Sequence, residues 1–237
     1  MRRIAYVGAA ALAAHALPAI TANSALRQRL FPALAGVGSP GRVALTFDDG
    51  PDPASTPAFL TALDKLGWKA TFFMLGPMVR RAPALAAEVA AAGHEIAVHG
   101  ERHRSHFWRS LPDLTDDLAR ATDTLAEATQ QPPVWFRPPY GALTTGSLVA
   151  ARRQNLKTVL WTAWGRDWRT KATPYSVAAD VRHGLNPGAT VLLHDSDCTS
   201  SPGSWRTTLA SLLALAELFE ERGLQVGRLA DHGLIRS

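Results

Sequence analysis

Two adjacent carboxylates and two closely spaced imidazoles are the side chains of this sequence best suited to chemistry. Asp48 and Asp49 follow a short apolar run and precede a Gly-Pro turn. Because successive side chains diverge, one carboxylate can ligate a metal while the other acts as a general base. His99 and His103 are four residues apart, and on a helical turn they would share one face and bind one ion. The plainer alternative for Asp-Asp-Gly-Pro is an acidic turn.

Three further segments carry side chains with reactive or binding potential. Arg137 begins a Pro-Pro-Tyr-Gly turn and can hold a carboxylate through two hydrogen bonds. Since prolines donate no hydrogen bond, we expect the amides of Tyr140 and Gly141 to be free donors. His194 directly follows an apolar run and is either a general acid or a capped core residue. Three tryptophans within residues 161–168 suit a sugar ring or a small hydrophobic slot, with core packing as the alternative.

These side chains follow the ends of predicted strands. The predicted strands cover residues 43–47, 70–74, 95–98, 134–137, 158–162, 190–193 and 224–227. Helical stretches lie between them, one starting near residue 55 and others over residues 83–92, 113–129, 145–155, 174–185 and 205–222. About seven strands alternating with helices predict an α/β fold with a parallel sheet, open or closed into a barrel. The carboxyl ends of such strands form active sites, so we expect the reactive residues to meet there.

The composition sets limits on the class of protein. With 237 residues, 46% of them hydrophobic, the chain can bury one large core. The net charge of +5 lies entirely in residues 1–47, and the remaining 190 residues carry 20 basic and 20 acidic side chains. A neutral body argues against nucleic-acid binding. The single cysteine, Cys198, excludes an internal disulfide and a CxxC zinc site. It is either a group close to a metal or a small buried residue.

The N-terminus has a pattern typical of export. Residues 1–22 begin with two arginines and continue as an Ala-rich apolar run that His15 and Pro18 interrupt. This pattern predicts a secretory signal peptide or a weak N-terminal anchor, with a helix packed on the domain as the alternative. We therefore predict a leader with a tether over residues 1–41 and a folded domain over residues 42–237. The expected location is extracellular or in the cell envelope, with N-terminal or peripheral membrane association; a cytoplasmic location is the alternative.

In this order, the five motifs resemble those of the polysaccharide deacetylases, the NodB-homology domain of carbohydrate esterase family 4. The resemblance covers residues 42–229. The matching segments are Thr46 to Pro51, His99 to His103, Arg137 to Gly141, Asp167-Trp168 and Leu192 to His194. Two positions depart from the family pattern. Gly100 replaces the usual Ser or Thr, which either loosens the metal loop or moves its support elsewhere, and Trp164 replaces the first Asp of the fourth motif.

The resemblance implies a distorted parallel (β/α) barrel and a metal-dependent hydrolase. It implies removal of acetyl groups, N-acetyl above all, from a carbohydrate polymer or oligosaccharide. One divalent ion is implied, zinc first, with cobalt, nickel or manganese as alternatives. By resemblance its ligands are Asp49, His99 and His103, and Asp48 is the general base, oriented by Arg137.

The remaining motif residues also receive roles from the resemblance. His194 is the general acid, tuned by Asp167, and the Tyr140 amide serves the oxyanion. Trp168 and Leu192 line the acetyl slot. The partner is an acetylated glycan; chitin fragments, peptidoglycan, xylan and secreted glycans all fit. Two alternatives stay open: a hydrolase of another non-peptide C–N bond or of a small acetylated molecule, and an inactive glycan-binding domain.

Overall fold

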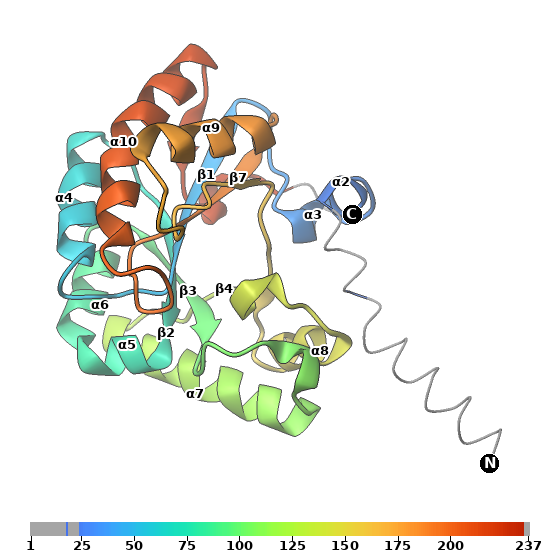
Figure 1. Ribbon diagram of the computed structural model, residues 1–237. Helices are drawn as coiled ribbons and strands as arrows, with labels where there is room; N and C mark the ends of the chain where they lie inside the picture. The colour runs from blue at the N-terminus through green and yellow to red at the C-terminus, as the bar shows by residue number, and fades with distance from the viewer. Residues whose placement is uncertain (1–17, 19–23, 235–237) are drawn as a thin grey trace.

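A curled parallel sheet forms the centre of the molecule (Figure 1). The computed structural model describes residue 18 and residues 24–234. The strands follow the order β5-β4-β3-β2-β1-β7-β6, with β8 paired to β1, and each of these pairings is parallel. Their bounds are β1 Arg42–Asp48, β2 Thr71–Leu75, β3 Glu95–Gly100, β4 Trp135–Phe136, β5 Lys157–Thr158, β6 Ala163–Trp164, β7 Ala189–His194 and β8 Gln225–Gly227. Over the described residues β5 and β6 do not pair, so the barrel is open there.

Helices connect the strands and pack around the outside of the sheet (Figure 1). They are α2 Ser24–Leu30, α3 Pro32–Ala35, α4 Thr56–Lys65, α5 Gly76–Arg81, α6 Pro83–Ala91, α7 Leu111–Thr129, α8 Thr145–Arg153, α9 Pro174–Gly184 and α10 Ser204–Glu221. Local sequence sets several starts: α8 and α9 each begin with a capping box, in which a Thr and a Ser three residues later satisfy each other's backbone amides.

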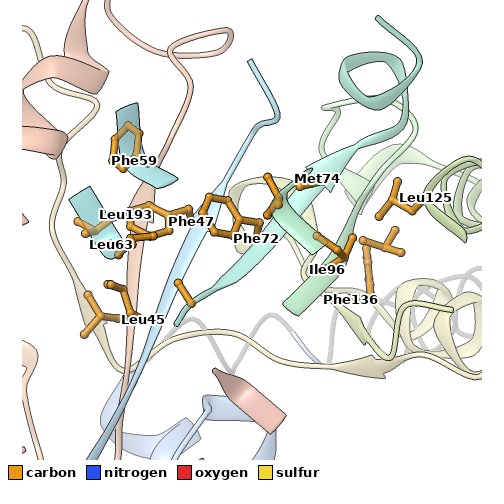
Figure 2. Close-up of a cluster of buried hydrophobic side chains, with 14 of the residues drawn as sticks. Leu45, Phe47, Phe59, Leu63, Phe72, Met74, Ile96, Leu125, Phe136 and Leu193 are labelled. Carbon is orange, nitrogen blue, oxygen red and sulfur yellow. The ribbon is translucent and has the colours of Figure 1, made fainter. Parts of the chain in front are cut away.

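The main core lies between the sheet and the helices (Figure 2). Phe47 of β1 packs on Phe72 of β2 and Phe59 of α4, with ring centroids 5.1 and 5.2 Å apart. Aromatic pairs of this kind add about 0.5–1.5 kcal/mol each beyond the area they bury. Residues 43–48 of β1 are all buried, as expected for a parallel sheet covered on both faces.

Alternation along β1 decides which side chains enter the barrel. Val43, Leu45 and Phe47 belong to the core under the helices, whereas Ala44 belongs to a second, smaller cluster. Thr46 and Asp48 share the face of Ala44, because side chains two apart on a strand point the same way. The last residue of β1 therefore turns its carboxylate toward the inside of the barrel mouth.

The structure confirms the α/β class and has elements that the sequence prediction lacks, beginning with α2 and α3 in the predicted tether. Strand β6 and helix α5 were not predicted. Strand β6 has two residues, too few for a periodic signal. Helix α5 begins with Gly76-Pro77, a pair that indicates a turn, although Pro is also favoured in a first helical turn.

The predicted signal peptide or anchor, residues 1–22, lies outside the described residues except for residue 18. The described part that follows it, residues 24–38, forms α2 and α3 and contacts the connection between β5 and β6. The Leu160 amide donates to the Leu34 carbonyl oxygen at 2.8 Å, and the Arg27 guanidinium donates to the Trp161 carbonyl oxygen at 2.7 Å. The domain boundary at residue 41 stays a prediction. Within the described residues, no helix combines the length and the apolar character that crossing a membrane requires.

Candidate active site

The predicted site residues gather at the carboxyl ends of β1, β3 and β7. Strand β1 lies between β2 and β7, and its last residue, Asp48, is in parallel register with His194, the last residue of β7. His99 is the next-to-last residue of β3. Motifs that are far apart in the sequence thus meet because the strands that carry them lie close together in the sheet.

Asp49, His99 and His103 form a group whose ligand atoms all lie within 4.8 Å of one another. The Asp49 Oδ1 atom is 3.4 Å from the Nε2 atom of each histidine. This oxygen is buried and has no hydrogen-bond partner, which is costly for a carboxylate unless a cation or donor faces it. Two imidazoles and one carboxylate are the donor set of catalytic zinc sites, so the three residues fit a divalent ion.

The protonation of His99 also suits metal binding. Burial lowers the pKa of His99 to about 3, so the imidazole is neutral at physiological pH, the form that ligates metals. Its Nδ1–H donates to the Arg137 carbonyl oxygen at 2.9 Å. This bond fixes the tautomer and leaves the Nε2 lone pair directed at Asp49.

The two histidines do not share a helical turn, and that prediction is wrong. His99 is in β3, His103 is in the following loop, and the chain turns at Gly100 with φ +114°. The Asp117 Oδ2 atom of α7 accepts the Glu101 amide at 2.8 Å, and a Cβ at Gly100 would lie 3.2 Å from that oxygen. A carboxylate from α7 therefore supports the loop. Of the two alternatives for the loss of a Ser or Thr at position 100, the structure shows support by another residue and not a loop without support.

Arg137 holds Asp48 in a buried ion pair. Its Nη1 donates to Asp48 Oδ1 at 2.7 Å and to Thr46 Oγ1 at 2.8 Å, and its Nη2 donates to the Leu160 carbonyl oxygen at 2.9 Å. The guanidinium also stacks over the Phe73 ring, 4.0 Å from its centroid. Burial raises the pKa of Asp48 above its ordinary value, although the Arg137 charge and hydrogen bond oppose the shift.

A second ion pair joins the buried Asp167 to the partly buried His194. Asp167 Oδ1 is 2.9 Å from His194 Nδ1, and Asp167 Oδ2 accepts the His194 amide at 2.8 Å and the Thr208 hydroxyl at 2.7 Å. Burial alone would lower the pKa of His194, but the charge and hydrogen bond of Asp167 outweigh it and raise the pKa to about 10. The imidazole is thus protonated at neutral pH, with Nε2 left to exchange a proton.

A cavity of about 300 Å³ opens beside these groups. It is lined by Asp48, His99, His103, Tyr140, Gly141, Trp161, Trp164, Trp168, Leu192, His194, Thr199 and Ser200. One wall is aromatic: the Trp164 ring lies 5.6 Å from that of Trp161 and 6.1 Å from that of Trp168. The three tryptophans therefore line the cavity, and their binding of a sugar ring or an apolar group stays a prediction.

Comparisons with known proteins agree with this geometry. The sequence profile described as Polysaccharide deacetylase matches residues 35–159. The chitooligosaccharide deacetylase of Bradyrhizobium sp. (strain ANU 289) is 32% identical over 192 residues, which cover 78% of this chain and 87% of that protein. This chain belongs to the polysaccharide deacetylase family. This chain is accordingly assigned to the metal-dependent hydrolases that remove acetyl groups from carbohydrates.

Two further relatives extend the comparison. The peptidoglycan-N-acetylglucosamine deacetylase PgdA of Listeria monocytogenes is 32% identical to this chain over 194 residues. The match covers 79% of this chain and 40% of PgdA, which is the longer protein. The crystal structure of the Bc1960 peptidoglycan N-acetylglucosamine deacetylase superposes on this chain with a TM-score of 0.78 at 27% identity. The superposition covers 85% of this chain and 92% of the Bc1960 chain.

The Pro-Pro-Tyr-Gly turn of the deacetylase differs from its prediction at one amide. The Gly141 amide donates to the Pro138 carbonyl oxygen at 2.9 Å, so it is not free, because the turn closes as a short 3₁₀ helix, η3 (Pro139–Gly141). Tyr140 has φ +60°, an uncommon conformation for a residue with a side chain. Its ring packs edge-on against His103, with centroids 4.5 Å apart.

Sequence reasoning missed three side chains that support the site of the deacetylase. Asp117 and Thr208 act through the contacts described above, and Thr199 donates to Asp49 Oδ2 at 2.5 Å. Cys198, next to it, is exposed and lies outside the metal-ligand group, with Sγ 3.6 Å from the Asp49 carbonyl oxygen. The expectation of a small buried cysteine is therefore wrong, since this loop lies at the surface.

Proposed function

We propose that the deacetylase hydrolyses the N-acetyl groups of a glycan containing N-acetylglucosamine, of the chitooligosaccharide or peptidoglycan class. The observation that carries the proposal is the meeting of Asp49, His99 and His103 with two ion pairs, Arg137–Asp48 and Asp167–His194, at one cavity. Relatives named as chitooligosaccharide and peptidoglycan deacetylases support the substrate class.

Asp49, His99 and His103 hold the metal in this proposal. When bound, a divalent ion polarises the acetyl carbonyl and lowers the pKa of water. Zinc is the first candidate, because the set of two imidazoles and one carboxylate is typical of catalytic zinc. Cobalt, nickel and manganese can occupy such a set when they are supplied.

Asp48 is the general base. Its Oδ1 is engaged by Arg137, whereas Oδ2 lies 3.8 Å from His99 Nε2 on the metal side of the cavity. Oδ2 is thus placed to take a proton from water as the water oxygen bonds to the acetyl carbon. Arg137 has two tasks: it fixes the orientation of Asp48, and its charge favours the ionised carboxylate.

His194 is the general acid. Asp167 holds its Nδ1 and keeps the ring protonated, so Nε2 can deliver a proton to the amine nitrogen as the C–N bond breaks. Asp48 has taken one proton and His194 has given one, and the products are acetate and a free amino sugar. Asp48 and His194 lie at the ends of the neighbouring strands β1 and β7, where they are paired in register.

The aromatic wall and the Tyr140 turn position the acetyl group. Trp168 and Leu192, with Trp161 and Trp164, line the cavity, and in this proposal they receive the methyl group of the acetyl. The Tyr140 amide is proposed as the oxyanion donor; removing one such donor from other enzymes slows them about 10²–10³-fold.

An extracellular or envelope location follows from the same proposal. The basic, Ala-rich N-terminus has an export pattern, and relatives that act on peptidoglycan have a cell-wall substrate. N-terminal or peripheral membrane association is part of this proposal.

The test is acetate release by the full-length chain from a matched panel. The panel contains chitooligosaccharides, peptidoglycan fragments, acetylated xylan and a small N-acetylated amine, each with chelator and with zinc or cobalt restored. We expect metal-restorable release from the N-acetylglucosamine substrates. Release from xylan or the small amine alone would contradict the substrate class. No release from any of them by metal-loaded protein would favour the binding-domain alternative.

A further inference from the structure

The loop between β7 and α10, residues 195–203, lines the cavity through Thr199 and Ser200 and contacts Asp49. The Thr199 hydroxyl donates to Asp49 Oδ2 at 2.5 Å, from a position 150 residues further along the chain. Thr199 lies outside the five motifs, and the matched family profile ends at residue 159.

The two oxygens of Asp49 have different surroundings. Oδ2 accepts from Thr199, while Oδ1 is buried without a hydrogen bond and lies 3.4 Å from both imidazole Nε2 atoms. A carboxylate can rotate about its last torsion with little intrinsic preference. A donor on one oxygen therefore fixes this torsion and keeps the other oxygen facing the histidines.

The loop that carries Thr199 is held at both ends. Asp197 Oδ2 accepts the Gly203 amide at 2.5 Å, and the Asp197 carbonyl oxygen accepts the Ser200 amide at 3.0 Å. The Ser201 amide reaches the Trp168 carbonyl oxygen at 3.4 Å. These contacts place the Thr199 hydroxyl although the residue itself is exposed.

We infer that Thr199 is a positioning residue for the metal ligand Asp49, and that its hydroxyl raises metal affinity by holding Oδ1 toward His99 and His103. The inference rests on the metal site of the proposed function. Partners of this kind, which orient a ligand without touching the ion, change metal affinity by about 10–100-fold in other proteins.

The experiment measures zinc affinity of the full-length chain by competition with a chromophoric chelator. Thr199→Val removes the hydroxyl and keeps the shape, whereas Thr199→Ser keeps the hydroxyl. We expect Thr199→Val to weaken zinc binding by about 10–100-fold and Thr199→Ser to stay within about threefold of the wild type. Thermal unfolding of the metal-free forms serves as the folding control, and Thr199→Ala replaces Thr199→Val if the valine variant does not fold.

Two results would overturn the inference. One is wild-type zinc affinity in Thr199→Val; the other is an equal loss in Thr199→Ser, because the hydroxyl would then not be the cause. The experiment measures zinc binding and not acetate release, so failure of the inference can be distinguished from failure of the proposed function. If the wild type bound zinc but released no acetate, the proposed reaction would fail while the role of Thr199 could still be measured.

Discussion

Asp48 at the end of β1 stands in register with His194 at the end of β7. Each lies beside an oppositely charged, fully buried partner, Arg137 for the carboxylate and Asp167 for the imidazole. Parallel pairing of two neighbouring strands thus places the proposed base and the proposed acid side by side. Arg137 opposes the upward shift that burial gives the pKa of Asp48, and Asp167 raises the pKa of His194.

Replacing Asp48 tests the assignment of the base. We expect Asp48→Asn to retain zinc, because Asp48 is not one of the three ligands, and to lose about 10²–10⁴-fold in kcat. Acetate release and metal content are measured together on the same preparation. The exposed Asp64→Asn serves as a control with unchanged kcat. An Asp48→Asn enzyme with full activity would exclude Asp48 as the base.

The pH profile of kcat/KM reports both pairs. The base must be ionised, so activity falls as pH drops through the pKa of Asp48, which burial raises above its ordinary value. The acid must be protonated, so activity falls as pH rises through the pKa of His194, near 10 in the metal-free protein.

Asp167→Asn shifts the alkaline side of that profile. Without the Asp167 charge, burial dominates and the pKa of His194 falls, so we expect the alkaline limb to move to lower pH. The loss of kcat at neutral pH should be about 10²-fold. An unmoved alkaline limb would show that another group is the acid.

Arg137→Lys tests the orientation of Asp48. Lysine keeps the charge but cannot donate simultaneously to Asp48, Thr46 and the Leu160 carbonyl oxygen in the planar geometry of arginine. Because Arg137 lowers the pKa of Asp48, weakening the contact should move the acid limb of the profile to higher pH. Misplacing the base should also cost about 10²-fold in kcat. A wild-type profile in this variant would contradict the orienting role.

Sequence and structure agree best where a motif coincides with a regular element. The apolar run before Asp48 predicted β1, and the rule that active sites form at carboxyl strand ends placed Asp48 and His194 together. The motif residues were found because their identity and spacing carry the signal.

The remaining features depend on contacts between distant segments. The His99 and His103 spacing indicated a helical turn, whereas the backbone is a strand end followed by a bend at Gly100 with positive φ. Thr199 could not be found from its neighbours, because a run of small polar residues has no periodicity and its partner is 150 residues away.

We expect a side chain at position 100 to lower the free energy of unfolding. Gly100→Ala places a Cβ at φ +114° and 3.2 Å from Asp117 Oδ2. Gly67→Ala is the matched control, with φ +66° and no atom within 4 Å of the new Cβ. We expect the control to lose about 1 kcal/mol of unfolding free energy and Gly100→Ala to lose more, about 2 kcal/mol. Equal losses in denaturant titrations would show that contact with Asp117 adds nothing.

Metal dependence of deacetylation is the most direct test of the central claim. The full-length protein is stripped with a chelator, its metal content is determined, and acetate release from a chitooligosaccharide is followed before and after one equivalent of zinc. The account predicts loss of release in the stripped wild type, recovery with zinc, and no recovery in His99→Ala. Full release by verified metal-free protein would contradict it.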